Sequence, residues 1–280
     1  MRKRNKKKYL FSLYSANLAE TNNGVGGEFL CPLCHNKFNY EQSDSLTIEH
    51  IVPEALGGSI ETLTCKKCNN QFGADLISKL TTNFETKAKI QNSAPFDARL
   101  AIDGKSIAVD FLANKETRFI MRPTRSDPKN ISYIENLIKY GKTKEMELSV
   151  KLGFGPEVEE MALLLMSYLI LFRTFGYPYI LSHWGLRTRN VIIKNEYDSP
   201  LVKFSVESKE TIVRGDSLVF ICKSPKEFEN YAGIQIRLRA NNFEEIKTKI
   251  LPIFPESKFS VEGLPKNQGF QIVGEPITGG

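Results

Sequence analysis

The sequence predicts an α+β protein in which a small metal-stabilised domain precedes a larger α+β domain. Three observations support this prediction. Two CxxC pairs enclose a strand-like run, a helix-like apolar spacing follows the second pair, and strand-like and helix-like runs fill the remaining chain. We therefore expect a basic tail and lead-in over 1–27, a metal-stabilised domain over 28–92, and an α+β domain of unknown role over 97–280.

The composition is that of a globular protein with a neutral body. The chain has 280 residues, of which 41% are hydrophobic, and this is enough for a substantial core. The net charge of +6 comes from the opening MRKRNKKK, because without it the basic and acidic residues balance. A neutral body argues against a broad surface that coats nucleic acid. We expect the basic tail to be solvated and disordered, with non-specific phosphate contacts as the alternative.

Nothing in the sequence predicts secretion or a membrane span. The run YLFSLYSANLAE after the basic start lacks the sustained apolar core of a signal peptide. The most apolar stretch, at 161–172, has twelve residues, whereas a span needs about 20, so we expect a buried core helix there. A reducing, cytoplasmic location follows as the expectation, and with it metal-binding cysteines in place of disulfides.

Four cysteines have the spacing of a zinc site. Cys31 with Cys34, and Cys65 with Cys68, form two CxxC pairs separated by thirty residues. Each pair can present two thiolates to one ion, so the four complete a tetrahedral site. Redox-active or unrelated thiols are the alternative. A closed four-thiolate site leaves no open position for chemistry, so its role would be structural. Cys222 lies in the apolar run SLVFIC and is interpreted as a small buried hydrophobe.

The predicted elements of the first domain are one strand and one long helix. The run LTIEHIVP has the β-branched content of a strand, which Pro53 would end. Residues 9–30 are turn-rich and are expected to form no core. Apolar residues then recur every four positions, the spacing of one helix face, at Phe72, Leu76, Leu80, Phe84 and Ala88.

The larger domain is predicted from alternating patterns. Asp103–Gly104 is a hairpin signal between two strand-like runs, and KETRFIMRP supplies a third strand. Further helices are expected at 129–140, 156–175, 179–190 and 242–250. Further strands are expected at 201–206, 211–222 and 233–239.

The segment EHIVPEALGG, together with the following LTCKKCNN, resembles the HNH nuclease family. The shared features are the acid followed by histidine, the strand end at IVP, the Gly-Gly bend and the CNN that opens a helix. The resemblance covers roughly residues 28–90. It implies a ββα-metal fold and a metal-dependent endonuclease that hydrolyses DNA phosphodiester bonds.

The resemblance also implies roles for three residues. Glu49 and Asn69 would hold a divalent cation, and their hard oxygen atoms favour Mg²⁺ or Mn²⁺. His50 would be the general base that takes a proton from the attacking water. Neighbouring side chains on a strand point to opposite faces, so Glu49 and His50 can share a water only where the strand ends or twists.

Two departures from the family pattern concern individual residues. The segment SIETLTC lacks the asparagine that braces the histidine loop in the family, and Thr62 is a candidate replacement. The last motif position is Asn69 or Asn70, and the alignment of the motif favours Asn69. His35 is interpreted as a surface residue beside the first CxxC pair, with a role as a metal ligand as the alternative, and His183 is interpreted as a structural residue.

Several functional questions stay open from the sequence. Lys37, Lys66 and Lys67 are candidate phosphate contacts, with a solvated face as the alternative. A non-catalytic zinc module that binds nucleic acid or protein is the competing function. Residues 97–280 could bind a protein partner or mediate oligomerisation. A restriction or phage-defence role is one possibility for the protein, and no motif in residues 97–280 selects it.

Overall fold

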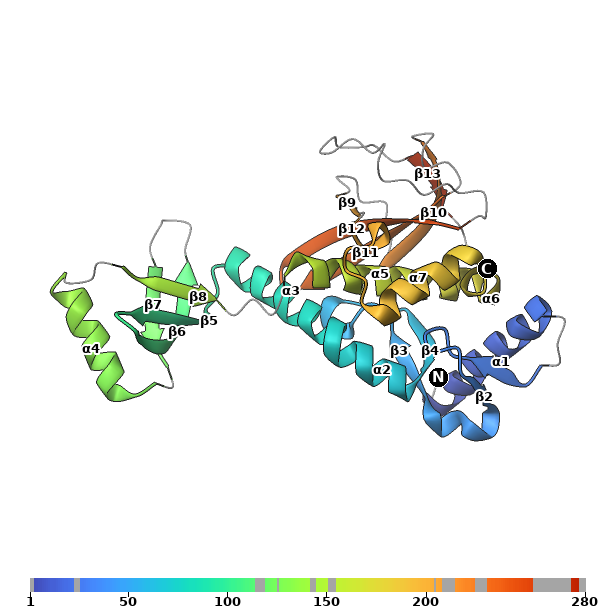
Figure 1. Ribbon diagram of the computed structural model, residues 1–280, viewed down its shortest axis with the longest axis horizontal. Helices are drawn as coiled ribbons and strands as arrows, with labels where there is room; N and C mark the ends of the chain where they lie inside the picture. Colours follow the sequence, from blue (N-terminus) through green and yellow to red (C-terminus); the bar gives the residue numbers. More distant parts are fainter. Residues whose placement is uncertain are drawn as a thin grey trace. The chain divides into compact units, whose positions relative to one another are not determined.

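The structure is a computed structural model, and its fold is α+β as predicted (Figure 1). It describes residues 3–22, 26–113, 119–124, 126–141, 145–150, 155–203, 205–207, 215–224, 231–253 and 273–276. The chain divides into two compact units. Unit 1 contains residues 1–81, 155–239 and 244–280, and unit 2 contains residues 82–154 and 240–243.

The basic N-terminal segment is a helix, so the prediction of a disordered tail and coreless lead-in is wrong. Helix α1 spans Lys3–Asn22. One face of this helix is buried, through Leu10, Phe11, Tyr14 and Leu18. Their spacing of one, three and four residues is helical, but the six preceding charges obscure it in the sequence. A basic residue of the helix also makes tertiary hydrogen bonds, because Lys7 Nζ donates to the carbonyl oxygens of Ser43 and Leu46.

Two hairpins follow α1 in unit 1, and then a long helical segment begins in unit 1 and continues past residue 81 into unit 2. The strands are β1 (Glu28–Leu30), β2 (Lys37–Asn39), β3 (Leu46–His50) and β4 (Glu61–Cys65), with 3₁₀ turns η1 (Tyr40–Ser45) and η2 (Glu54–Leu56). The helical segment comprises α2 (Lys66–Phe72), a π-helical turn η3 (Gly73–Ile77) and α3 (Ser78–Gln91). β3 pairs with β4 and β1 with β2, both antiparallel, and α2 packs against β3 and β4. The strand that ends before Pro53 is confirmed, and all five residues of the predicted helix face are buried.

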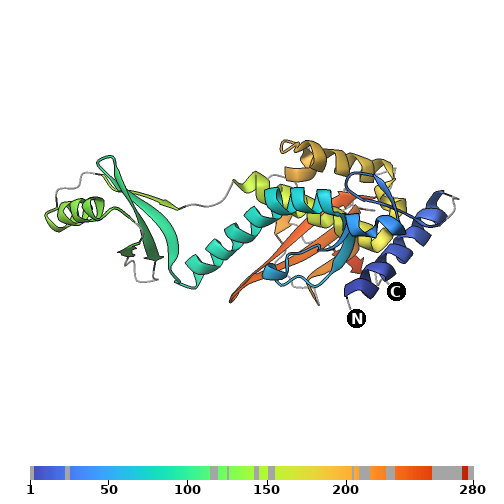
Figure 2. The same ribbon diagram turned by 90° about the horizontal axis from the view of Figure 1, so that it is seen from below.

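A buried helix connects the hairpins to the C-terminal sheet. Helix α5 (Pro156–Phe175) is followed by α6 (Tyr177–Ile180), α7 (His183–Lys194) and α8 (Pro200–Lys203). Every residue from 161 to 172 is buried, which confirms the predicted core helix. Figures 1 and 2 show α5 between the five-stranded sheet and the N-terminal hairpins. Among the helices that the structure describes, none has the length and apolar character needed to cross a bilayer.

The predicted boundary near residue 97 does not separate the two units. Contacts from α5, α6 and α7 support the first CxxC segment. Tyr168 Oη donates to the Pro32 carbonyl at 2.7 Å, and Tyr177 Oη donates to the Leu30 carbonyl at 2.8 Å. Arg189 Nε donates to the Leu33 carbonyl at 2.6 Å. Residues 155–203 therefore complete the N-terminal core, and only the intervening segment forms a separate unit.

The C-terminal part of unit 1 is a sheet with the strand order β13-β10-β11-β12-β9. Its strands are β9 (Ser205–Glu207), β10 (Ser217–Ser224), β11 (Tyr231–Ala240), β12 (Phe243–Pro252) and β13 (Val273–Pro276). The predicted strand at 233–239 lies within β11. Of the predicted strand at 211–222, residues 217–222 lie in β10, and 211–214 are outside the described residues.

One predicted element of this region is wrong, and another is correct only in part. The helix expected at 242–250 is instead strand β12 from Phe243 onward, because Asn241 takes a left-handed φ of 54° in a tight turn and because the β-branched residues Ile246, Thr248 and Ile250 alternate. Of the strand expected at 201–206, residues 205–206 lie in strand β9, residues 201–203 lie in helix α8, and residue 204 is outside the described residues. Pro200 begins this helix at a position where its fixed φ is favourable.

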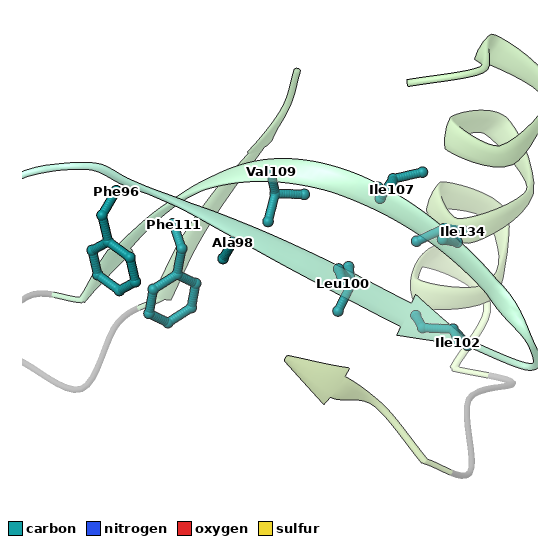
Figure 3. Close-up of a cluster of buried hydrophobic side chains, with 8 residues drawn as sticks. All are labelled: Phe96, Ala98, Leu100, Ile102, Ile107, Val109, Phe111 and Ile134. Carbon is teal, nitrogen blue, oxygen red and sulfur yellow. The ribbon is translucent and has the colours of Figure 1, made fainter. Parts of the chain in front are cut away.

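Unit 2 is a four-stranded antiparallel sheet with one helix. The strands are β5 (Phe96–Ile102), β6 (Lys105–Ala113), β7 (Phe119–Pro123) and β8 (Glu147–Val150), in the order β7-β6-β5-β8, and the helix is α4 (Pro128–Lys139). Figure 3 shows its core, in which Ile134 of α4 lies beside apolar side chains of β5 and β6. The hairpin predicted at Asp103–Gly104 is confirmed, since both residues have a left-handed φ.

Candidate metal and catalytic site

The four cysteines of the CxxC pairs form one cluster that could hold zinc. Their sulfur atoms all lie within 4.8 Å of one another, and the Cys34 and Cys65 sulfurs are 3.7 Å apart. A tetrahedral ion with Zn–S bonds of about 2.3 Å requires sulfur separations of about 3.8 Å, so the cluster fits zinc. The backbone N–H of Cys65 donates to the Cys31 sulfur, and that of Cys68 donates to the Cys65 sulfur. All five cysteines of the chain are free thiols, and Cys222 is buried in β10.

The first CxxC pair is held in a tight backbone turn. Cys31 N–H donates to the Asn36 carbonyl, and His35 N–H donates to the Cys31 carbonyl. His35 takes a left-handed φ of 58° and is half-buried. Burial and the nearby Arg189 guanidinium lower the pKa of His35 to about 4, so its imidazole is neutral at pH 7. His183 is exposed on α7 beside the Trp184 ring.

The second hairpin places Glu49 and Asn69 at one small cavity. The cavity has a volume of about 20 Å³, and both residues line it together with Thr64 and apolar side chains that include Leu165 and Leu169 of α5. The oxygens Asn69 Oδ1 and Thr64 Oγ1 are buried without a hydrogen-bond partner among the residues that the structure describes. Two oxygen atoms with unused acceptor capacity therefore share a cavity with a carboxylate.

The environment of Glu49 makes its carboxylate easy to protonate. Burial raises the pKa of Glu49 to about 7. The charged form is disfavoured because the low-polarity surroundings solvate it poorly. A bound cation would reverse this preference by neutralising the carboxylate charge.

His50 lies at the end of β3, opposite Glu61 of β4. His50 Nε2 is 3.4 Å from Glu61 Oε1, and the second Glu61 oxygen contacts Lys6 Nζ. The His50 side chain is 38% exposed and that of Glu61 is 15% exposed, so the imidazole is open to solvent and its partner is mostly covered. The neighbouring pair in the hairpin register is Glu49 with Thr62.

Thr62, the candidate brace considered from the sequence, contacts a different partner in the structure. Thr62 Oγ1 is 2.8 Å from Tyr14 Oη, so the Thr62 hydroxyl forms a hydrogen bond with helix α1. Glu61 is the side chain beside the imidazole, and sequence reasoning missed it. Only the hairpin register could have identified it, because cross-strand partners depend on the length and shape of the connecting loop.

The candidate phosphate contacts differ in their surroundings. Lys66 and Lys67 are exposed in the first turn of α2. Lys37 Nζ is paired with Glu28 Oε2 at 2.7 Å, and both of these side chains of the hairpin β1–β2 are exposed. Asn70, the alternative to Asn69, is exposed and does not line the cavity, whereas Asn69 does.

The loop between β3 and β4 is fixed from two sides. Gly57 has a φ of 83°, and a Cβ added to Gly58 would lie 1.9 Å from the Val52 carbonyl oxygen. The Asp216 carboxylate accepts hydrogen bonds from the backbone N–H groups of Ser59 and Ile60. The Gly-Gly bend in the sequence therefore has a steric cause at each position.

Comparison with known families agrees with the resemblance seen in the sequence. The HNH endonuclease family model matches residues 30–85. The matched segment contains Glu49, His50, Asn69 and all four cysteines of the cluster. HNH endonucleases act on nucleic acid and use divalent metals. Neither curated proteins nor solved structures gave a match to this chain.

Proposed function

We propose that this protein is a metal-dependent endonuclease that hydrolyses phosphodiester bonds in DNA. The observation that supports the proposal best is the cavity shared by Glu49 and Asn69, one strand position from the partly exposed His50. These residues lie inside the segment that matches the HNH endonuclease family. A hard cation with oxygen ligands suits the Glu49 carboxylate and the Asn69 amide oxygen, and the latter has no hydrogen-bond partner among the residues that the structure describes.

The proposed roles follow from the chemistry of each group. Glu49 and Asn69 would hold Mg²⁺ or Mn²⁺, while His50 takes a proton from the attacking water. A neutral imidazole is suited to this task at pH 7 because it has a free lone pair. The cation, when bound, stabilises negative charge on the scissile phosphate and on the leaving 3′ oxygen. Lys66 and Lys67 are positioned to contact phosphates as exposed cations.

The zinc ion is proposed to be structural. Four thiolates leave no open coordination position, and the cluster joins the first hairpin to the start of α2. We expect one zinc per chain. Removing it with a strong chelator should unfold the hairpin region, because binding and folding of such sites are coupled. Cys34→Ser should lower the zinc content, and Cys222→Ala, outside the cluster, should not.

A plasmid-nicking assay tests the proposal. Purified, zinc-loaded protein should nick supercoiled DNA when Mg²⁺ or Mn²⁺ is added, and single- and double-stranded DNA and RNA define the substrate. His50→Ala should reduce the rate by about 10²–10⁴-fold while its zinc content and circular dichroism stay unchanged. His183→Ala removes an exposed histidine outside the site and should cleave normally. Equal rates for His50→Ala and wild type would refute the role of His50.

A second candidate function is a non-catalytic zinc module that binds nucleic acid or protein. It is favoured by the small size of the cavity, since about 20 Å³ holds little more than one water molecule. Calorimetry separates the two functions. One bound zinc, no measurable Mn²⁺ binding and no cleavage of any substrate would select the binding module. Crosslinking of the full-length protein would then test whether residues 97–280 mediate oligomerisation.

A further inference from the structure

We infer that Glu61 is a positioning residue for His50 and that helix α1, through Lys6, holds Glu61 in place. The inference rests on the proposed function, because it concerns how His50 serves as the base. It assigns a specific tautomer to the imidazole, with the hydrogen on Nε2 and the free lone pair on Nδ1. It also makes the basic N-terminal helix part of the site.

The hairpin register brings the two side chains together. His50 and Glu61 are directly opposite each other on antiparallel strands, so both project from the same face of the hairpin. The distance of 3.4 Å from His50 Nε2 to Glu61 Oε1 places the carboxylate at one ring nitrogen and leaves the other ring nitrogen away from it. The side chain of Glu61 is only 15% exposed, so water competes weakly for its oxygens.

The tautomer follows from hydrogen-bond chemistry. An ionised carboxylate only accepts hydrogen bonds, so the ring nitrogen that faces it must carry the hydrogen. In a neutral imidazole the other nitrogen, Nδ1, then keeps its lone pair. Nδ1 is therefore the atom of His50 that would receive the proton from water.

Helix α1 constrains the carboxylate from its other side. Lys6 Nζ contacts Glu61 Oε2, which leaves Oε1 for the imidazole. The next residue, Lys7, donates to the carbonyls of Ser43 and Leu46, so this turn of α1 is fixed to the start of β3. The chain thus supplies, from β4 and α1, a brace at the place where SIETLTC has no asparagine.

Nitrogen-15 NMR of the imidazole tests the tautomer directly, without any cleavage measurement. The full-length, zinc-loaded protein contains three histidines, and His50→Ala identifies the signals of His50. At alkaline pH the wild type should show the Nε2–H tautomer. Glu61→Ala should give a mixture of tautomers, and Lys6→Ala should move the signals in the same direction by a smaller amount.

Two matched substitutions serve as controls for the lost charges. Glu54→Ala removes an exposed glutamate from the loop between β3 and β4, and Lys8→Ala removes an exposed lysine from α1, the helix that carries Lys6. Both should leave the His50 signals unchanged. An Nδ1–H tautomer in the wild type, or identical His50 signals in wild type and Glu61→Ala, would overturn the inference. Glu61→Gln provides a second variant of similar size if the alanine variant does not fold.

Cleavage kinetics distinguish a failure of this inference from a failure of the proposed nuclease. Glu61→Ala should lower kcat by about 10- to 100-fold with little change in KM, less than the about 10²–10⁴-fold expected for loss of the base itself. Glu61→Asp should recover part of the rate. If His50→Ala abolishes cleavage but Glu61→Ala does not reduce it, the nuclease stands and the brace is wrong. If no variant cleaves, including wild type, the NMR result still decides the role of Glu61.

Discussion

The phenolic oxygen of Tyr14 lies 2.8 Å from Thr62 Oγ1, and both side chains are buried. This contact joins α1 to the middle of β4, one residue from Glu61. The Tyr14 ring also stacks on Phe172 of α5, with ring centroids 4.5 Å apart. The N-terminal helix is therefore part of the core that supports the candidate site.

Tyr14→Phe should destabilise the protein while preserving its fold. The substitution keeps the aromatic packing but leaves the buried Thr62 hydroxyl without its partner, which costs about 1–2 kcal/mol. Urea unfolding followed by circular dichroism measures the change. Tyr9→Phe is the matched control on the same helix, because Tyr9 is 56% exposed and its substitution should have little effect. Equal losses in the two variants would contradict a specific role for the Tyr14–Thr62 bond.

Gly58→Ala should destabilise the loop that connects β3 to β4. A Cβ at this position would lie 1.9 Å from the Val52 carbonyl oxygen, so the backbone must move to admit it. We expect a loss of about 2 kcal/mol or more in the free energy of unfolding. Gly73→Ala is the control, because its Cβ meets no atom within 4 Å and alanine favours helix. A Gly58→Ala protein as stable as wild type would show that the loop adapts freely.

The sequence was sufficient for features that depend on local spacing. The cysteine pairs, the strand that ends before Pro53 and the four-residue apolar repeat all followed from residue order alone. Features that depend on tertiary pairing were missed. The partner of His50 depends on the register of a hairpin whose loop contains ten residues, 51–60, and sequence spacing does not determine that register.

The errors in secondary structure have related causes. In α1 the charged first turn hides a short apolar stripe, which becomes stable only because β4 and α5 cover it. In β12 the apolar and charged residues fit a helical spacing as well as a strand. The turn at Asn241 decides between the two by directing the chain back along β11.

Stability should fall with rising pH in the absence of divalent cations because of Glu49. Its pKa is about 7 in the folded protein, above the ordinary value of 4.5, so folding favours the protonated carboxyl. This contribution is complete below about pH 4.5 and is lost as the pH rises to about 7, with a size on the order of 2 kcal/mol. Unfolding of zinc-loaded protein across this range measures it, and Glu49→Gln should remove the slope that Glu49 contributes.

Binding of the proposed divalent cation should show the opposite dependence on pH. Mn²⁺ requires the ionised carboxylate, so its affinity should rise as the pH increases through about 7. Calorimetric titrations with Mn²⁺ at several pH values check this. Glu49→Gln should abolish the binding. Glu54→Gln changes an exposed glutamate in the loop that follows β3 and should retain it. Unchanged affinity between pH 5 and pH 8, or retained binding by Glu49→Gln, would exclude Glu49 as a ligand.

Asp216 should link the five-stranded sheet to the hairpin β3–β4, which carries Glu49 and His50. Its carboxylate is buried and accepts from the N–H groups of Ser59 and Ile60, while its own carbonyl accepts from Arg237 N–H of β11. Asp216→Ala leaves two backbone donors without a partner, so the free energy of unfolding should fall by about 2–3 kcal/mol. Asp216→Asn keeps one acceptor oxygen and should lose less.

The effect of Asp216 on His50 can be separated from its effect on stability. Ile60 directly precedes Glu61, so a loosened loop should let Glu61 move away from the imidazole. At a temperature where Asp216→Ala is fully folded, the His50 nitrogen-15 signals should shift toward those of Glu61→Ala. The exposed Asp44 provides the control, because Asp44→Ala should change neither the signals nor the stability by more than about 0.5 kcal/mol. A destabilised Asp216→Ala protein with wild-type His50 signals would show that the sheet supports the fold without positioning Glu61.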